Sequence, residues 1–165
     1  MTDDEPTPTV DDDEEPLGIP QIDRTIERIL VPVDGSTGSE LGMAWADGIA
    51  DVTGAELIVT VAFNPPIAIR RRGILQTEHL QVEMEDDAKE LATEATQLFL
   101  DRGRRARAIV VRGDPATAIL EVAEDEEVDL IVIGRRGVGR LQGVLVGSVS
   151  EKVARHAKVP VFLAS

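Results

Sequence analysis

The stretch that decides the fold lies at residues 28–36 and reads Arg28-Ile-Leu-Val-Pro-Val-Asp-Gly-Ser36. Its apolar part does not alternate with polar residues, which is typical of a strand in a parallel sheet that helices cover on both faces. The strand is expected to end at Asp34. Beyond it, Thr37-Gly-Ser-Glu40 has the pattern of a capping box and predicts the start of a helix.

Strands and helices then alternate to the end of the chain. Further strands are expected at 56–63, 106–112, 129–133 and 159–163. The first helix is expected to stop at Gly54, and the others to cover 76–102, to open at Asp114-Pro115 and to cover 148–156. This order implies right-handed crossovers, and therefore a single α/β domain with a five-stranded parallel sheet and helices on both faces.

The spacing of apolar residues predicts which face of each helix is buried. The first helix is expected to face inward with Leu41, Ala44, Trp45, Gly48, Ile49 and Val52, of which Trp45 is the core anchor. The inner stripe of the long second helix is expected to be Leu80, Met84, Ala88, Leu91, Ala95 and Leu98. Because only 2% of the residues are aromatic, the core must be aliphatic.

Composition excludes several classes of protein. The 165 residues include no cysteine, which excludes disulfides and thiolate metal sites. No apolar run approaches the roughly 20 residues of a membrane span, and the N-terminus lacks the pattern of a secretory signal. A cytoplasmic protein without a membrane partner is therefore expected.

The distribution of charge separates a tail from the domain. Residues 1–20 hold eight acidic residues, four prolines and no basic residue, so 1–24 is expected to be a disordered acidic tail and 25–165 the domain. The net charge of −14 argues against nucleic acid as a partner. Many acids with few lysines indicate a halophilic protein, and an ordinary acidic protein is the alternative.

A glycine-rich loop after the fourth strand carries the strongest chemical signal. It reads Gly134-Arg-Arg-Gly-Val-Gly-Arg-Leu-Gln-Gly-Val-Leu-Val-Gly-Ser148. Glycines let the backbone approach a ligand closely, and the helix that follows offers unpaired N–H groups and a positive dipole end to phosphate. Arg135, Arg136 and Arg140 add guanidinium groups, whose geometry matches that of phosphate.

An ordinary structural interpretation of the same residues stays open. Ser148-Val-Ser-Glu151 is also a capping box that would serve the helix itself, and glycines after strands are common turns. The arginines of the loop could be solvated surface, as is expected of the run Arg70-Arg71-Arg72.

This loop, taken with both ends of the domain, resembles the ATP-binding branch of the universal stress protein family. The shared pattern is Gly, two residues, Gly, nine residues, Gly, Ser, and it continues to the family's usual ending at Val161. At the other end, residues 29–36 resemble the family's opening strand and loop. The resemblance implies an open Rossmann-like sandwich with strand order 3-2-1-4-5, dimerisation, and ATP with Mg²⁺ bound between the first and fourth strands.

The resemblance also assigns the binding residues by position. Pro32, Val33 and Asp34 would meet adenine and ribose, and Val61 would line the adenine pocket. Ile133, Gly134, Arg136 and Gly137 would line ribose and phosphates, with Arg136 standing where many relatives have histidine. The triphosphate would be held by Gly147, Ser148, Val149 and Ser150. No catalytic residue and no metal-ligand cluster is assigned.

Three functions are compatible with these features. The favoured one is an ATP-binding regulator, a nucleotide-dependent dimeric switch in the stress response with an unknown protein partner. A slow ATPase is the alternative, although the loop supplies donors and cations but no positioned carboxylate or histidine. A nucleotide-independent interaction module is the third, and the intact glycine spacing argues against it. A homodimer is expected through the last strand, because an apolar edge left unpaired is a hazard, and a monomer with a short edge is the alternative.

Overall fold

The computed structural model describes residues 25–65, 74–135 and 147–165. Its strands are β1 Arg28–Pro32, β2 Glu56–Phe63, β3 Ala106–Arg112, β4 Leu130–Gly134 and β5 Val161–Ala164. Its helices are α1 Thr37–Thr53, α2 Ile74–Leu100, α3 Pro115–Asp125 and α4 Ser148–His156. The predictions for the tail 1–24, for Arg70, Arg71 and Arg72, and for Arg136 and Gly137 lie outside the described residues.

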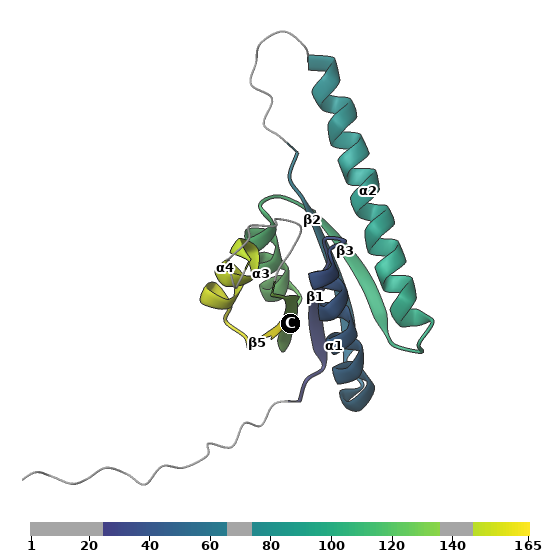
Figure 1. Ribbon diagram of the computed structural model, residues 1–165, viewed down its shortest axis with the longest axis vertical. Helices are drawn as coiled ribbons and strands as arrows, with labels where there is room; N and C mark the ends of the chain where they lie inside the picture. The colour runs from purple at the N-terminus through teal and green to yellow at the C-terminus, as the bar shows by residue number, and fades with distance from the viewer. Residues whose placement is uncertain (1–24, 66–73, 136–146) are drawn as a thin grey trace, which may run out of the picture.

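The five strands form one sheet in the order β3-β2-β1-β4-β5, and every pair is parallel. This confirms the predicted α/β class, the number of strands and their order. The chain builds outward from β1 through β2 to β3 and then continues with β4 on the other side of β1, so the order reverses between β1 and β4. Strand β5 is left at one edge of the sheet (Figure 1).

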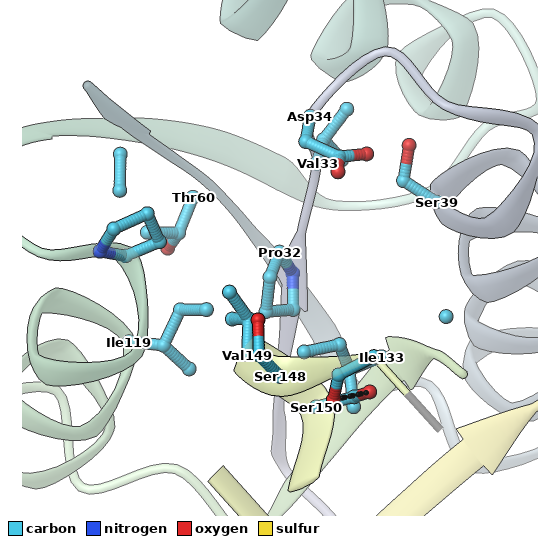
Figure 2. Close-up of a pocket in the computed structure, with 14 residues that line it drawn as sticks. Pro32, Val33, Asp34, Ser39, Thr60, Ile119, Ile133, Ser148, Val149 and Ser150 are labelled. Carbon is cyan, nitrogen blue, oxygen red and sulfur yellow. Dashed lines mark hydrogen bonds between the residues drawn. The ribbon is translucent and has the colours of Figure 1, made fainter. Parts of the chain in front are cut away.

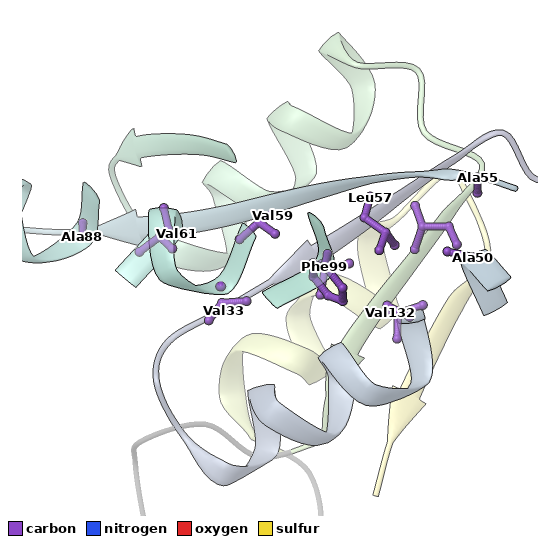
Figure 3. Packing of buried hydrophobic residues seen from close by; sticks show 14 of the residues in the cluster. Val33, Ala50, Ala55, Leu57, Val59, Val61, Ala88, Phe99 and Val132 are labelled. Carbon is purple, nitrogen blue, oxygen red and sulfur yellow. The ribbon is translucent and has the colours of Figure 1, made fainter. Parts of the chain in front are cut away.

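Helices cover both faces of the sheet, and each face has its own aliphatic cluster. One cluster joins Ile29, Val31 and Val59 to buried residues of α1 and α2, and Figure 3 shows part of it around Phe99. The other joins strand residues of the opposite face to α3 and α4. Because neighbouring residues of a strand point to opposite faces, alternate residues of β1 and β2 belong to different clusters.

Helix α1 packs on the sheet through small residues, so the predicted inner face was wrong at most positions, although Ile49 packs against the core as expected. Gly42, Ala46 and Ala50 are buried, whereas the expected core anchor Trp45 is 50% exposed. A Cβ at Gly42 would lie 3.1 Å from the backbone nitrogen of Gly134, so the helix is too close to β4 for large side chains. The Trp45 ring packs instead beside β5, with its centroid 5.0 Å from that of the Phe162 ring.

The ends of α1 differ slightly from the prediction. The N-cap is Ser36, whose Oγ accepts a hydrogen bond from the backbone N–H of Ser39 at 3.1 Å, so the capping interaction begins one residue earlier than expected. The helix stops at Gly54 as predicted, because Gly54 adopts the left-handed conformation with φ 72°.

Helix α2 buries a stripe that differs in part from the predicted one. Ala88 and Ala95 are buried as expected, but the other buried apolar positions are Ala92 and Phe99, and Leu98 is exposed. The N-terminal part of the helix projects beyond the sheet, and Leu80 is accordingly exposed (Figure 1). Despite this length, neither α2 nor another helix in the described parts of the chain is apolar enough to cross a membrane.

Candidate ligand-binding site

A cavity of about 350 Å³ opens at the carboxyl ends of β1 and β4, where the strand order reverses (Figure 2). Such a crevice is the usual ligand site of an open parallel α/β sheet. The cavity is lined by Pro32, Val33, Asp34, Ser39, Thr60, Ala62, Pro115, Ile119, Ile133, Gly134, Gly147, Ser148, Val149 and Ser150.

The structure brings together most of the residues that the sequence predicted for the site. All described members of the predicted set line the cavity except Val61, which is buried in the cluster under α1 and α2. Because alternate residues of β2 point to opposite faces of the sheet, the side chain of Val61 faces away from the cavity, and its predicted contact with adenine stays a prediction. Its neighbours Thr60 and Ala62 line the cavity instead.

The loop after β1 forms one wall of the cavity. The Asp34 carboxylate accepts hydrogen bonds from the backbone N–H of Ser36 at 3.1 Å and from its hydroxyl at 2.6 Å. Gly35 between them has φ 73°, a conformation that favours glycine. Asp34 thus holds the turn from which α1 begins, and it also lines the cavity.

The N-terminus of α4 forms the opposite wall and points its first turn at the cavity. Gly147 is the N-cap, and no described side chain makes a capping hydrogen bond there, so the predicted capping box at Ser148 does not form. The Ser150 hydroxyl lies 2.9 Å from the carbonyl oxygen of Arg135 and 3.0 Å from that of Gly147, one of which receives its proton. Among the described residues no side chain partners the first N–H groups of α4, and such a helix end favours an anion.

Glycine at position 134 is required by packing. A Cβ added to Gly134 would lie 2.2 Å from the carbonyl oxygen of Gly38 and 2.9 Å from the backbone nitrogen of Ser39. The end of β4 and the first turn of α1 therefore touch backbone to backbone. This contact sets the width of the cavity, because Ser39 and Gly134 both line it.

An ion pair joins the two helices on the α3 side of the cavity. Lys152 of α4 places Nζ 2.8 Å from Oδ2 of Asp114, the N-cap of α3, and this hydrogen bond lowers the pKa of Asp114 to about 2. Asp114 also accepts from the backbone N–H and the hydroxyl of Thr117, and these hydrogen bonds contribute to the same lowered pKa of about 2. The start of α3, where Pro115 lines the cavity, is thus fixed to α4.

Sequence reasoning missed five lining residues, which are Ser39, Thr60, Ala62, Pro115 and Ile119. Two of them, Thr60 and Ala62, are alternate residues of β2 and therefore point to the same face of the sheet. Thr60 is also the register partner of Pro32, which was predicted to line the site. No sequence pattern gives the position of α3, because it depends on how the helix crosses the sheet. Thr60 stands out in this group: it is 1% exposed, and its hydroxyl has no hydrogen-bond partner among the described residues.

Fold and cavity together define a doubly wound α/β domain with a crevice at its topological switch point. The model of the Universal stress protein family matches residues 25–165, and the chain belongs to that family. A universal stress protein from Thermus aquaticus is 36% identical over 135 residues, which cover 82% of this chain and 96% of that protein.

Solved structures show the same architecture. The universal stress protein UspA from Lactobacillus plantarum superposes with a TM-score of 0.75 at 25% identity, and the match covers 86% of this chain and 99% of that one. A universal stress protein in complex with cAMP superposes with a TM-score of 0.64 at 26% identity, covering 84% of this chain and 97% of that one.

Proposed function

We propose that this chain binds ATP in the cavity between β1 and β4 and acts as a nucleotide-dependent regulator, not as a fast enzyme. The observation that carries the proposal is the first turn of α4, which no described side chain caps and which opens onto the cavity at the point where the sheet order reverses. Unpaired N–H groups and a positive dipole end at such a place suit a phosphate chain.

The two ends of the cavity differ in chemistry, and this difference orients the ligand. On the α4 side, Gly147, Ser148 and Ser150 present backbone and hydroxyl groups, which suit the triphosphate. On the α3 side, Ala62, Pro115 and Ile119 present carbon, which suits the faces of a purine ring. Arg136 and Gly137 are proposed to complete the phosphate end.

A bound nucleotide in a relative supports the choice of ligand. The structure of the universal stress protein in complex with cAMP shows that a chain of this fold, 26% identical to the present one, takes up an adenine nucleotide. The glycine and serine spacing from Gly134 to Ser148 adds a reason to prefer a nucleotide with several phosphates.

Magnesium is proposed to arrive with the triphosphate and not as a resident ion. The described residues contain no group of three or more metal-ligating side chains. Mg²⁺ commonly keeps several waters and binds through substrate phosphates with one or two carboxylates.

Binding is favoured over hydrolysis by the groups that line the cavity. An ATPase needs a base or a water-positioning group near the γ-phosphate. Among the described lining residues, Asp34 is the one carboxylate and there is no histidine, and Asp34 is held by Ser36 at the opposite wall from α4. We therefore propose at most slow hydrolysis.

A homodimer through β5 is proposed as the form in which the nucleotide acts. Strand β5 is an edge strand, and the half-exposed Trp45 lies beside it against Phe162. An apolar edge strand with an exposed aromatic ring beside it is a suitable surface for a second copy across a two-fold axis.

Mass spectrometry of the nucleotide released from purified, heat-denatured protein tests the proposal. ATP or ADP in near-equal ratio to the protein is expected. If protein that has been incubated with excess ATP and then freed of unbound nucleotide releases no ATP or ADP on denaturation, the proposal is refuted.

A further inference from the structure

Thr60 is a buried polar residue at the floor of the cavity. It is 1% exposed, and among the described residues its hydroxyl has no hydrogen-bond partner. Its backbone carbonyl oxygen is engaged, because it accepts from the N–H of Val33 at 2.9 Å. An unpaired hydroxyl in an apolar environment is costly, so a residue of this kind needs an explanation.

The surroundings of Thr60 contain carbon almost exclusively. Thr60 is the register partner of Pro32 on β1, and both side chains point to the face that α3 covers (Figure 2). The neighbouring lining residues are Ala62 on the same strand and Ile119 on α3. A valine would fill the position equally well, so packing alone does not account for a hydroxyl there.

We propose that the Thr60 hydroxyl determines ligand specificity by hydrogen-bonding to a ring nitrogen or exocyclic group at the edge of the bound nucleobase. This inference rests on the proposed function, because it assigns the apolar end of the same cavity to the base. Nucleobases have apolar faces and polar edges, which matches carbon walls with one threonine at the floor, whose Oγ1 is shielded from solvent in the conformation described. A step between staggered χ1 rotamers exchanges Oγ1 with Cγ2, so the hydroxyl can turn to whichever side the ring edge occupies.

Phosphate is a poor partner for this hydroxyl. The groups that suit phosphate, the first N–H groups of α4 and the backbone around Gly147, lie on the other side of the cavity. At the Thr60 end, Pro115 and Ile119 would desolvate a phosphate oxygen without compensating its charge. A neutral heterocycle pays no such penalty.

The test compares Thr60→Val with Thr60→Ser by calorimetric titration with ATP, adenosine and inorganic tripolyphosphate. Thr60→Val keeps the shape and removes the hydroxyl, so its affinity for ATP and for adenosine should fall by about tenfold, the value of one good hydrogen bond. Its affinity for tripolyphosphate should not change. Thr60→Ser keeps the hydroxyl and should keep both base-dependent affinities within about threefold of the wild type.

The melting temperature of the ligand-free proteins gives a second readout, because Thr60→Val should affect stability and ATP affinity in opposite directions. Thr60→Val removes an unpaired buried hydroxyl, so it should melt at or above the temperature of the wild type while it binds ATP less well. Equal ATP affinity for Thr60→Val and wild type would overturn this inference and leave the proposed function standing. An equal loss for ATP and tripolyphosphate would overturn it as well, because it would indicate a general distortion. A wild type that binds neither ATP nor adenosine would defeat the proposed function, and this inference with it.

Discussion

Replacing Gly134 with alanine should damage both the fold and the cavity, because the added methyl group has no space. It would lie 2.2 Å from the carbonyl oxygen of Gly38, about 1 Å closer than van der Waals contact allows. Both partners are backbone, so neither can rotate away as a side chain would. The end of β4 and the first turn of α1 must separate instead.

This displacement should lower the free energy of unfolding. Overpacking of a tight core contact typically costs 1–3 kcal/mol, and a backbone clash belongs at the upper end, so we expect a loss of about 3 kcal/mol in the free energy of unfolding. For a domain of this size that corresponds to a fall of about 9 °C in melting temperature. The displaced segment includes Ser39, which lines the cavity, so ATP affinity should fall as well.

Gly48→Ala is the matched control within the same region. Gly48 lies inside α1, and nothing stands within 4 Å of a Cβ added there. The same chemical change should therefore stabilise the protein by about 0.5–1 kcal/mol, because alanine is a better helix former. Urea unfolding at equilibrium measures both variants. If Gly134→Ala unfolds within about 0.5 kcal/mol of the wild type, the packing argument is wrong.

Two further predictions concern the ion pair and the dimer. Asp114→Asn keeps an N-cap but removes the charge that pairs with Lys152. Because the folded pKa of Asp114, about 2, lies below its ordinary value of 3.8, the charge stabilises the fold above that ordinary value, and this contribution disappears as the pH falls towards 2. The difference in unfolding free energy between wild type and variant should thus shrink between about pH 5 and pH 2, and a constant difference would contradict the assignment. For the dimer, Pro160 and Ala164 accept hydrogen bonds from β4, so the N–H of Val161 points away from the sheet. Val161→Pro should convert a dimeric wild type to monomer in sedimentation velocity with little loss of stability, since proline is tolerated at the first residue of an edge strand. A wild type that is monomeric at micromolar concentration would refute the β5 interface.

The fold could be predicted because its signals are local. The apolar run at 28–33 and the alternation of strands with helices indicate a parallel sheet without knowledge of any contact. The helix faces were harder. In α1 the spacing of the large apolar residues Leu41, Trp45 and Val52 predicts the wrong buried face. The small residues Gly42 and Ala46 are buried instead and allow the helix to approach β4. The hydrophobicity of the residues does not reveal that this packing depends on how closely the backbones of α1 and β4 approach, and not on the size of the side chains.

The candidate site was predictable where it follows directly from strand ends and helix starts. Asp34, Gly134 and Gly147 were found because they flank such ends. Thr60 and Ile119 were not, since one depends on strand register and the other on the crossing of α3 over the sheet. The side chain of Val61 lies on the other face from its neighbour Thr60, because successive residues of a strand point to opposite faces of the sheet.

Calorimetric titration of wild type, Ser148→Ala and Gly147→Val with MgATP tests most directly whether the first turn of α4 holds the phosphates of ATP, as we propose. The wild type should bind in a one-to-one ratio, and Ser148→Ala should bind somewhat less tightly because it loses one hydroxyl donor. Gly147→Val should remain folded and bind nothing, because a β-branched side chain would occupy the space where the phosphates meet the helix. Heat of binding from Gly147→Val equal to that of the wild type, or no heat from the wild type at millimolar MgATP at both low and high salt, would contradict the account.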